Sequence, residues 1–70
     1  MINWYVKELD TGLKVASGDA LDEDTANTEC FHYAIQYVQD GPIEYCVKNG
    51  RKILVKGTMS RVTVKEMSDD

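Results

Sequence analysis

Residues 21–42 read LDEDTANTECFHYAIQYVQDGP, and this stretch decides the fold because it carries the start and the end of one helix. Asp22 is placed to accept hydrogen bonds from the first free N–H groups of a helix. The two acids that follow it suit the positive end of the helix dipole. Gly41 and Pro42 then end the helix. We therefore predict a helix over residues 22–40.

Apolar residues of this helix recur at a spacing that places them on one side. Such a stripe must be buried against another layer, and strand-like runs on both sides of the helix predict that this layer is a sheet. The predicted stripe consists of Phe31, Ala34, Ile35 and Val38, flanked by Cys30 and Tyr37.

The stretch before the helix predicts a β-hairpin, because residues 2–9 and 13–17 are rich in aromatic and β-branched residues and Gly12 can turn the chain between them. Two registers are open. A three-residue loop with a glycine bulge sets Glu8 opposite Lys14. A two-residue turn instead places Trp4, Val6, Leu13 and Val15 on one face, which makes the better core.

The stretch after the helix predicts a second hairpin and a last strand. Ile43 to Val47 alternates, and Asn49-Gly50 is a strong hairpin signal. With a Lys48-Asn49-Gly50 loop, the opposed pairs are Tyr45 and Ile53, Ile43 and Val55, and Cys46 and Lys52. Residues 57–60 are then expected to turn, residues 61–65 to form a strand with Val62 and Val64 inward, and residues 67–70 to fray.

These elements predict an α+β fold, one antiparallel sheet of four to five strands in ββαβββ order with one amphipathic helix on one face. Residues 1–70 are expected to form a single domain, and self-association is an open alternative for so small a core. On the face away from the helix the alternation places Glu44, Cys46, Lys52, Leu54, Lys56, Arg61, Thr63 and Lys65.

No apolar run approaches the length that spans a bilayer, and the N-terminus shows no signal-peptide pattern. We expect a cytoplasmic protein, in the host cytoplasm if a phage encodes it. Cys30 and Cys46 are too few for a secreted disulfide framework, so two buried free thiols are expected, although pairing stays open.

Spacing disfavours the metal and catalytic sites that the sequence offers. Asp19, Asp22, Glu23 and Asp24 match no calcium-binding loop, and a helix N-terminus explains them. Cys30 and His32 point to different sides of a helix, which disfavours zinc with Cys46 and also a nucleophilic pair. The sequence therefore predicts no cofactor, no metal and no enzyme.

Charge is unevenly distributed along the chain. Residues 1–45 hold two lysines and nine acids, a net charge of −7, whereas residues 46–70 hold six bases and three acids, a net charge of +3. The molecule is expected to be electrically two-faced, and such a field can orient a partner. Solvation of the helix by acids and protection of sheet edges by bases explains the same charges.

The bases of the second half form the alternative site, a surface for a nucleic-acid backbone. The low pI of about 4.8 opposes this interpretation unless the basic face is well separated from the acids. The residues of this alternative site are Lys48, Arg51, Lys52, Lys56, Arg61 and Lys65.

The chain has more aromatic residues than one thin core can bury. One strand cannot bury Trp4 and Tyr5 on the same face, and exposed Trp and Tyr residues are frequent interface anchors. An acidic helix can also take the place of nucleic acid on a basic partner. The predicted partner-binding residues are Trp4, Tyr5, Asp24, Glu29, His32, Tyr33 and Gln36.

In size, acidity and ββαβββ layout the chain resembles small accessory proteins of phages and mobile elements, including anti-CRISPR proteins. This resemblance carries no residue-by-residue match, and it implies inhibition by binding and occlusion. The expected function is that of a non-enzymatic protein-binding module whose partner is a protein or a ribonucleoprotein complex. The alternative is a small nucleic-acid-binding domain that uses the second hairpin.

Overall fold

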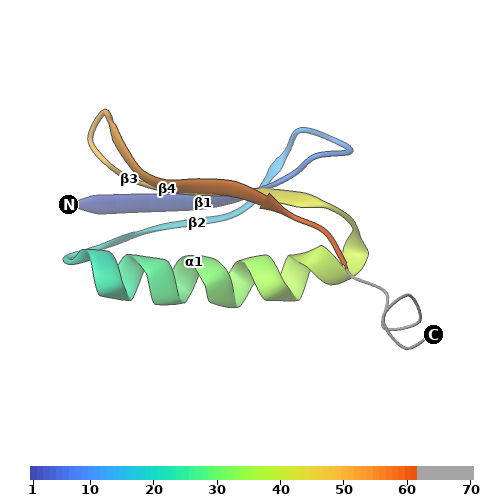
Figure 1. Cartoon of the computed structure of the whole chain (residues 1–70), viewed down its shortest axis with the longest axis horizontal. Coiled ribbons are helices and arrows are strands. Elements are labelled where there is room, and N and C mark those ends of the chain that lie inside the picture. Colours follow the sequence, from blue (N-terminus) through green and yellow to red (C-terminus); the bar gives the residue numbers. More distant parts are fainter. Residues whose placement is uncertain (62–70) are drawn as a thin grey trace, which may run out of the picture.

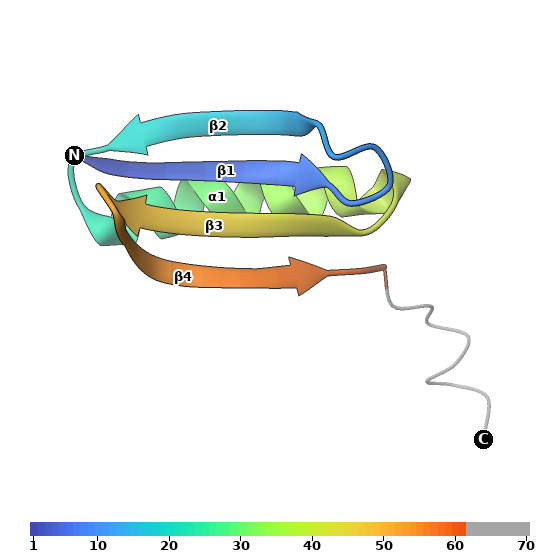
Figure 2. The ribbon, with the colours of Figure 1, turned by 90° about the horizontal axis from the view of Figure 1, so that it is seen from above.

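Four strands form one antiparallel sheet in the order β2-β1-β3-β4, and a single helix lies across one face of it (Figures 1 and 2). The computed structural model describes residues 1–61. The elements are β1 (Ile2–Glu8), β2 (Lys14–Ala20), α1 (Glu23–Tyr37), the short 3₁₀ helix η1 (Val38–Asp40), β3 (Ile43–Asn49) and β4 (Lys52–Met59). The predicted α+β fold with one helix on one antiparallel sheet is confirmed.

Both ends of α1 follow from local chemistry. The side chain of Asp22 accepts a hydrogen bond of 2.8 Å from the Thr25 N–H. This hydrogen bond lowers the pKa of the Asp22 carboxyl below its ordinary value, because the ionised form is the better acceptor. At the other end the chain tightens into η1, and Gly41 ends it with a φ of +154°.

The buried side of α1 differs from the predicted stripe. Ala26, Cys30 and Ala34 are fully buried, whereas Ile35 is 58% exposed. The prediction that Ile35 packs on the sheet is therefore wrong. Small side chains face the sheet because the aromatic side chains of the strands already fill the space between the layers, and a helix with small residues can approach them closely. Phe31 is half-buried at the edge of this contact.

Two glycines make room for those aromatic side chains. Trp4 lies opposite Gly18, and a Cβ atom built on Gly18 would stand 2.8 Å from the indole ring. Tyr45 lies opposite Gly57, where a Cβ would stand 2.7 Å from the phenol oxygen. Both glycines therefore lie inside strands. The prediction that residues 57–60 turn is wrong, and β2 continues past the predicted end at residue 17.

The first hairpin takes neither predicted register. Its loop spans residues 9–13, closed by a 2.8 Å hydrogen bond from the Glu8 N–H to the Leu13 carbonyl. Lys14 lies opposite Lys7 rather than Glu8, with an irregularity after Val6. The preferred core face is wrong for Leu13, which is 64% exposed, because the longer loop lifts it off the sheet.

The second hairpin also closes differently from the prediction. Asn49 pairs with Lys52, so the turn is formed by Gly50 and Arg51, with Gly50 at a φ of +63°. This shorter turn shifts the register, which is shifted again after Val47. The predicted opposed pairs are therefore wrong. Tyr45 faces Gly57, Ile43 faces Met59 and Cys46 faces Lys56.

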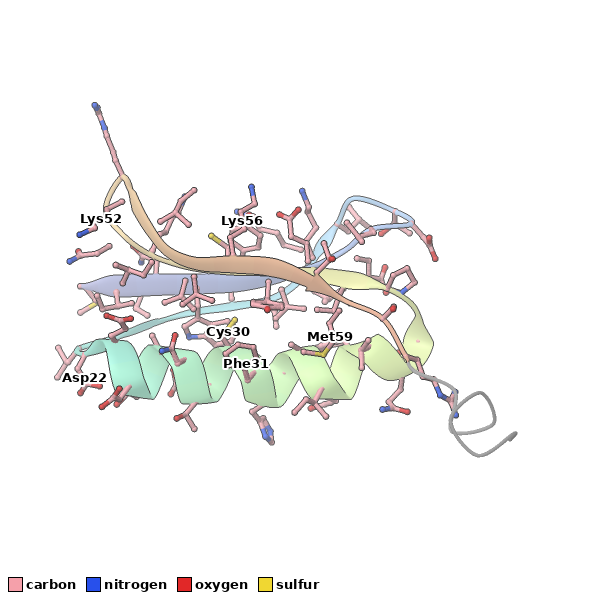
Figure 3. All side chains as sticks on the ribbon, in the orientation of Figure 1. Asp22, Cys30, Phe31, Lys52, Lys56 and Met59 are labelled. Carbon is pink, nitrogen blue, oxygen red and sulfur yellow. The ribbon has the colours of Figure 1, made fainter. Side chains whose placement is uncertain are left out.

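The core between the layers holds the alternate residues of β1 and the small residues of α1. Figure 3 shows Cys30, Phe31 and Met59 between helix and sheet. No helix within residues 1–61 is both long and apolar enough to cross a membrane. The predicted last strand over residues 61–65 lies, apart from exposed Arg61, outside the described residues, as does the predicted frayed end. The core residues are Ile2, Trp4, Val6, Ala20, Ala26, Cys30, Ala34, Val38, Ile43 and Val47.

Candidate binding surfaces

The sheet face opposite the helix, called here the outer face, can be mapped from the strand register. Side chains alternate along each strand, so the neighbours of buried Trp4 and Val6 point away from α1. Figure 3 shows Lys56 on this side. From β2 to β4, the outer face forms three rows: Lys14, Lys7, Glu44 and Thr58; Ser17, Tyr5, Cys46 and Lys56; and Asp19, Asn3, Lys48 and Ile53.

Tyr5 and Cys46 form the centre of the outer face. The Tyr5 hydroxyl donates a 3.0 Å hydrogen bond to Glu44 Oε2, and the Lys14 ammonium lies 4.8 Å from the centre of the Tyr5 ring. Burial, followed by the hydrogen bond to the Glu44 carboxylate, raises the pKa of Tyr5 to about 12. The phenol therefore stays protonated at neutral pH and acts as a donor.

Both carboxylates of the outer face are engaged by neighbours. Glu44 Oε2 lies 3.8 Å from Lys7 Nζ in addition to accepting from Tyr5. Asp19 accepts a hydrogen bond from the Asn3 amide. Within residues 1–61 the Lys7 pair is the sole ion pair, so the other lysines of the face have no acidic partner in this part of the chain.

A pocket of about 290 Å³ opens beside Tyr5 on the outer face. Lysines from two different strands, β2 and β3, line it, together with an amide and a hydroxyl group. One carboxylate, that of Asp19, lies among these groups. The polar and charged side chains of the pocket are Asn3, Tyr5, Lys14, Ser17, Asp19 and Lys48.

The opposite side of the molecule is the solvent-facing side of α1, called here the helix surface. It carries no lysine or arginine, because residues 15–47 contain none. A shallow depression of about 370 Å³ lies on its first turns, lined by two acids and two threonines. The helix surface consists of Asp24, Thr25, Thr28, Glu29, His32, Tyr33, Ile35 and Gln36.

Trp4 supports the helix surface from below. It is 5% exposed, its indole N–H donates a 3.2 Å hydrogen bond to Glu29 Oε1, and its ring stacks on Tyr33 at 5.4 Å between centres. The His32 ring meets the edge of Tyr33 at 5.1 Å. Trp4 thus fixes Glu29 and Tyr33 in place but offers little surface of its own to a partner.

The predicted partner-binding residues are therefore divided among three places. Glu29, His32, Tyr33 and Gln36 share one flank of α1, and Asp24 lies on the other flank, since successive residues are about 100° apart. Trp4 lies beneath the first flank. Tyr5 lies on the outer face, separated from the rest by the whole sheet.

The alternative nucleic-acid residues are also divided. Lys48 and Lys56 lie on the outer face. Arg51 lies in the β3–β4 turn, and Lys52 begins β4 directly after it. Figure 3 shows Lys52 and Lys56 at different points along β4. Arg61 follows β4, and Lys65 lies outside the described residues. Sequence reasoning missed Lys7 and Lys14, which join the same face from the first hairpin. The alternation of Asn3, Tyr5 and Lys7 with the buried residues of β1 was the signal that could have revealed the first of them.

The two cysteines are free and buried. Cys30 lies in the core, with its Sγ 3.8 Å from the Tyr5 carbonyl oxygen and 4.0 Å from that of Cys46. The side chain of Cys46 belongs to the other face of the sheet. His32 is exposed on α1, so the structure does not gather these three residues around one point.

Comparisons of the chain with models of protein families, with curated proteins and with solved structures found no match.

Proposed function

We propose that the protein is a non-enzymatic binding module whose helix surface docks on a basic region of a macromolecular partner. The observation that carries the proposal is the separation of charge between the two faces. The helix and its two ends bear Asp22, Glu23, Asp24, Glu29 and Asp40, and residues 15–47 contain no lysine or arginine, whereas Lys7, Lys14, Lys48 and Lys56 lie on the outer face. Such a separation orients a molecule toward a positively charged partner.

The depression on the first turns of α1 supplies the specific contact. Carboxylates and hydroxyls that accept hydrogen bonds line it, so it fits an arginine or lysine side chain of the partner. Ile35 and Tyr33 add exposed apolar and aromatic area beside it. An apolar anchor flanked by polar groups is the usual composition of a protein interface.

Occlusion is the activity that this surface would exert. The chain is small, and binding alone would block whatever the basic region of the partner normally contacts, including nucleic acid. The proposal extends to an inhibitor of the kind that phages direct against host complexes, because the chain resembles anti-CRISPR proteins in its size and acidity.

A capture experiment with matched variants tests the proposal. We would immobilise the chain, expose it to extract of the native host, and compare the parent with Ile35→Ser and with Asp24→Lys. Neither side chain contacts the core, so both variants should keep the fold. We expect the captured protein to be lost from both variants and retained by Lys56→Glu on the outer face.

Purified partner then gives the decisive measurement. Asp24→Lys should slow association and flatten its dependence on salt, because long-range attraction is screened by ions. Association that is equally fast for the parent and for Asp24→Lys, or loss of binding in Lys56→Glu alone, would show that the helix surface is not the docking site.

A further inference from the structure

We infer that the outer face of the sheet binds single-stranded nucleic acid, with its phosphates on Lys14, Lys48 and Lys56 and a base beside Tyr5. This inference uses the side of the molecule opposite the helix surface, so it stands independently of the proposed docking on a protein.

The positive charge of the outer face comes from lysines on three different strands. Lys14, Lys48 and Lys56 come from β2, β3 and β4, and the register places them around Tyr5. Strands lie about 4.8 Å apart and alternate residues about 7 Å apart, so the Cα atoms of these lysines spread over roughly 14 Å in each direction. An area of that size can hold several phosphates of one strand, and phosphates reward clustered cations.

Few acids compete with a phosphate for these lysines. Of the two carboxylates on the same face, Glu44 is paired with Lys7 and accepts from Tyr5, whereas Asp19 accepts from the uncharged amide of Asn3. The three lysines therefore outnumber the one carboxylate that is not paired with a lysine within residues 1–61. Five acids lie on α1 and at its two ends, behind the sheet. The positive face is thus separated from the negative one, which is the condition that an acidic protein must meet to hold a polyanion.

The pocket beside Tyr5 offers a place for a base. Lys14 lines this pocket and its ammonium lies over the Tyr5 ring, 4.8 Å from the ring centre, so a phosphate held by Lys14 brings its base next to the phenol ring. The Asn3 amide and the Ser17 hydroxyl in the pocket can bond base edges. An aromatic ring beside cations is the arrangement that binds unpaired bases, which a duplex keeps stacked inside itself.

The shape of the outer side favours a single strand over a duplex. Figure 1 shows the β1–β2 loop and the β3–β4 turn rising on the side away from α1, near opposite ends of the sheet. The sheet between them is reached more easily by a flexible single strand than by a rigid duplex. A single strand can lie along the sheet and turn one base toward it.

The experiment measures binding of fluorescein-labelled 12-nucleotide DNA and RNA strands by anisotropy, with a duplex of the same sequence in parallel. We expect a single strand of at least one sugar type to bind at 50 mM salt and to bind more tightly than the duplex. If three phosphates are held, the logarithm of the association constant should fall with the logarithm of salt at a slope of about −2.

Matched variants separate this face from net charge. The triple variant Lys14→Gln, Lys48→Gln, Lys56→Gln should abolish binding. Its control, Thr28→Glu, His32→Glu, Gln36→Glu, changes the net charge by the same amount on the helix surface and should bind like the parent. Tyr5→Leu should weaken binding roughly tenfold through the lost ring, whereas Tyr5→Phe, which keeps the ring, should not. Circular dichroism verifies that each variant is folded.

Absence of single-strand binding at 50 mM salt would overturn the inference, as would equal losses in the two triple variants. Tighter binding of the duplex, or equal binding by Tyr5→Leu and the parent, would also overturn it. Failure of helix-surface docking leaves these results untouched, because none of them involves a protein partner.

Discussion

At the scale of single residues, two aromatic rings and two glycines determine how the layers fit together. Trp4 occupies the space over Gly18, and Tyr45 occupies the space over Gly57. In each case the ring covers backbone that a side chain would otherwise cover, which offsets the weakness of a glycine inside a strand. The rings in turn contact α1, Trp4 through Tyr33 and Tyr45 through Phe31.

Gly18→Ala is expected to lower the free energy of unfolding by about 1–3 kcal/mol, because the added methyl group collides with a buried indole that also carries a stacked ring and a hydrogen bond. Urea unfolding followed by the fluorescence of Trp4, the only tryptophan, measures this change. Gly57→Ala should cost less, since its nearest neighbour is the hydroxyl end of Tyr45.

The control for this prediction is Ser17→Ala, which changes the adjacent residue on the other face and should shift stability by no more than about 0.5 kcal/mol. A Gly18→Ala variant as stable as the parent would show that the close contact of the Trp4 ring with Gly18 does not contribute to stability.

At the scale of elements, the limits of the helix were readable from the sequence, but its buried side only in part: Ala34 and Val38 of the predicted stripe are buried, and Ile35 is not. Asp22 and Gly41 act through neighbours a few residues away, so local chemistry determines them. The side that faces the sheet depends on what the sheet already fills. The large apolar side chain of Ile35 suggested burial, and the small ones of Ala26 and Ala34 were what the crowded interlayer space accepted.

The hairpins show the same limit. Each hairpin contains the expected glycine at positive φ. The pairs of residues that close the two hairpins nevertheless differ from the predicted ones, and the β1–β2 and β3–β4 pairings each contain one register shift. A shift of register changes which residues meet, and the balance between neighbouring registers depends on the packing of rings such as Tyr45. The composition of the candidate surfaces depends on register in the same way, because the pairing of Lys14 with Lys7 is what places Lys14 on the outer face.

Two adjacent residues of α1 should therefore respond in opposite ways. Ala34→Leu is expected to lower the free energy of unfolding by about 1–3 kcal/mol, because Ala34 is fully buried against the sheet and a larger side chain overfills the contact. Ile35→Ala should change it by about 0.5 kcal/mol or less. Chemical denaturation of both variants checks the pair, and a larger loss from Ile35→Ala would restore the stripe predicted from the sequence.

At the scale of the whole molecule, the sheet separates an apolar side, which faces the helix, from a polar side, which faces solvent. Its helix side is a dry core beneath an acidic surface, and its outer face is a polar layer rich in lysine with Tyr5 and Cys46 at its centre. The helix surface and the outer face thus look in opposite directions. A protein partner on one and a nucleic acid on the other could be held at the same time, as a ribonucleoprotein complex would require.

The two thiols report on the two sides of the sheet. Cys30 is covered by α1 and the sheet, and burial raises the pKa of its thiol, so less of the reactive thiolate is present than in the unfolded chain. Cys46 is 2% exposed but is covered by side chains of the outer face alone. Reagents should therefore reach Cys30 only when helix and sheet separate, whereas side-chain motion suffices for Cys46.

Single-thiol variants, Cys46→Ala and Cys30→Ala, separate these two routes. Labelling of Cys30 by a disulfide reagent at pH 8 should be slow and should accelerate with urea in proportion to global unfolding. Labelling of Cys46 should be faster and nearly independent of low urea concentrations. Equal rates and equal urea dependence for both thiols would mean that the outer face is as rigid as the core, whereas rapid labelling of Cys30 in the native protein would contradict the packing of α1 on the sheet.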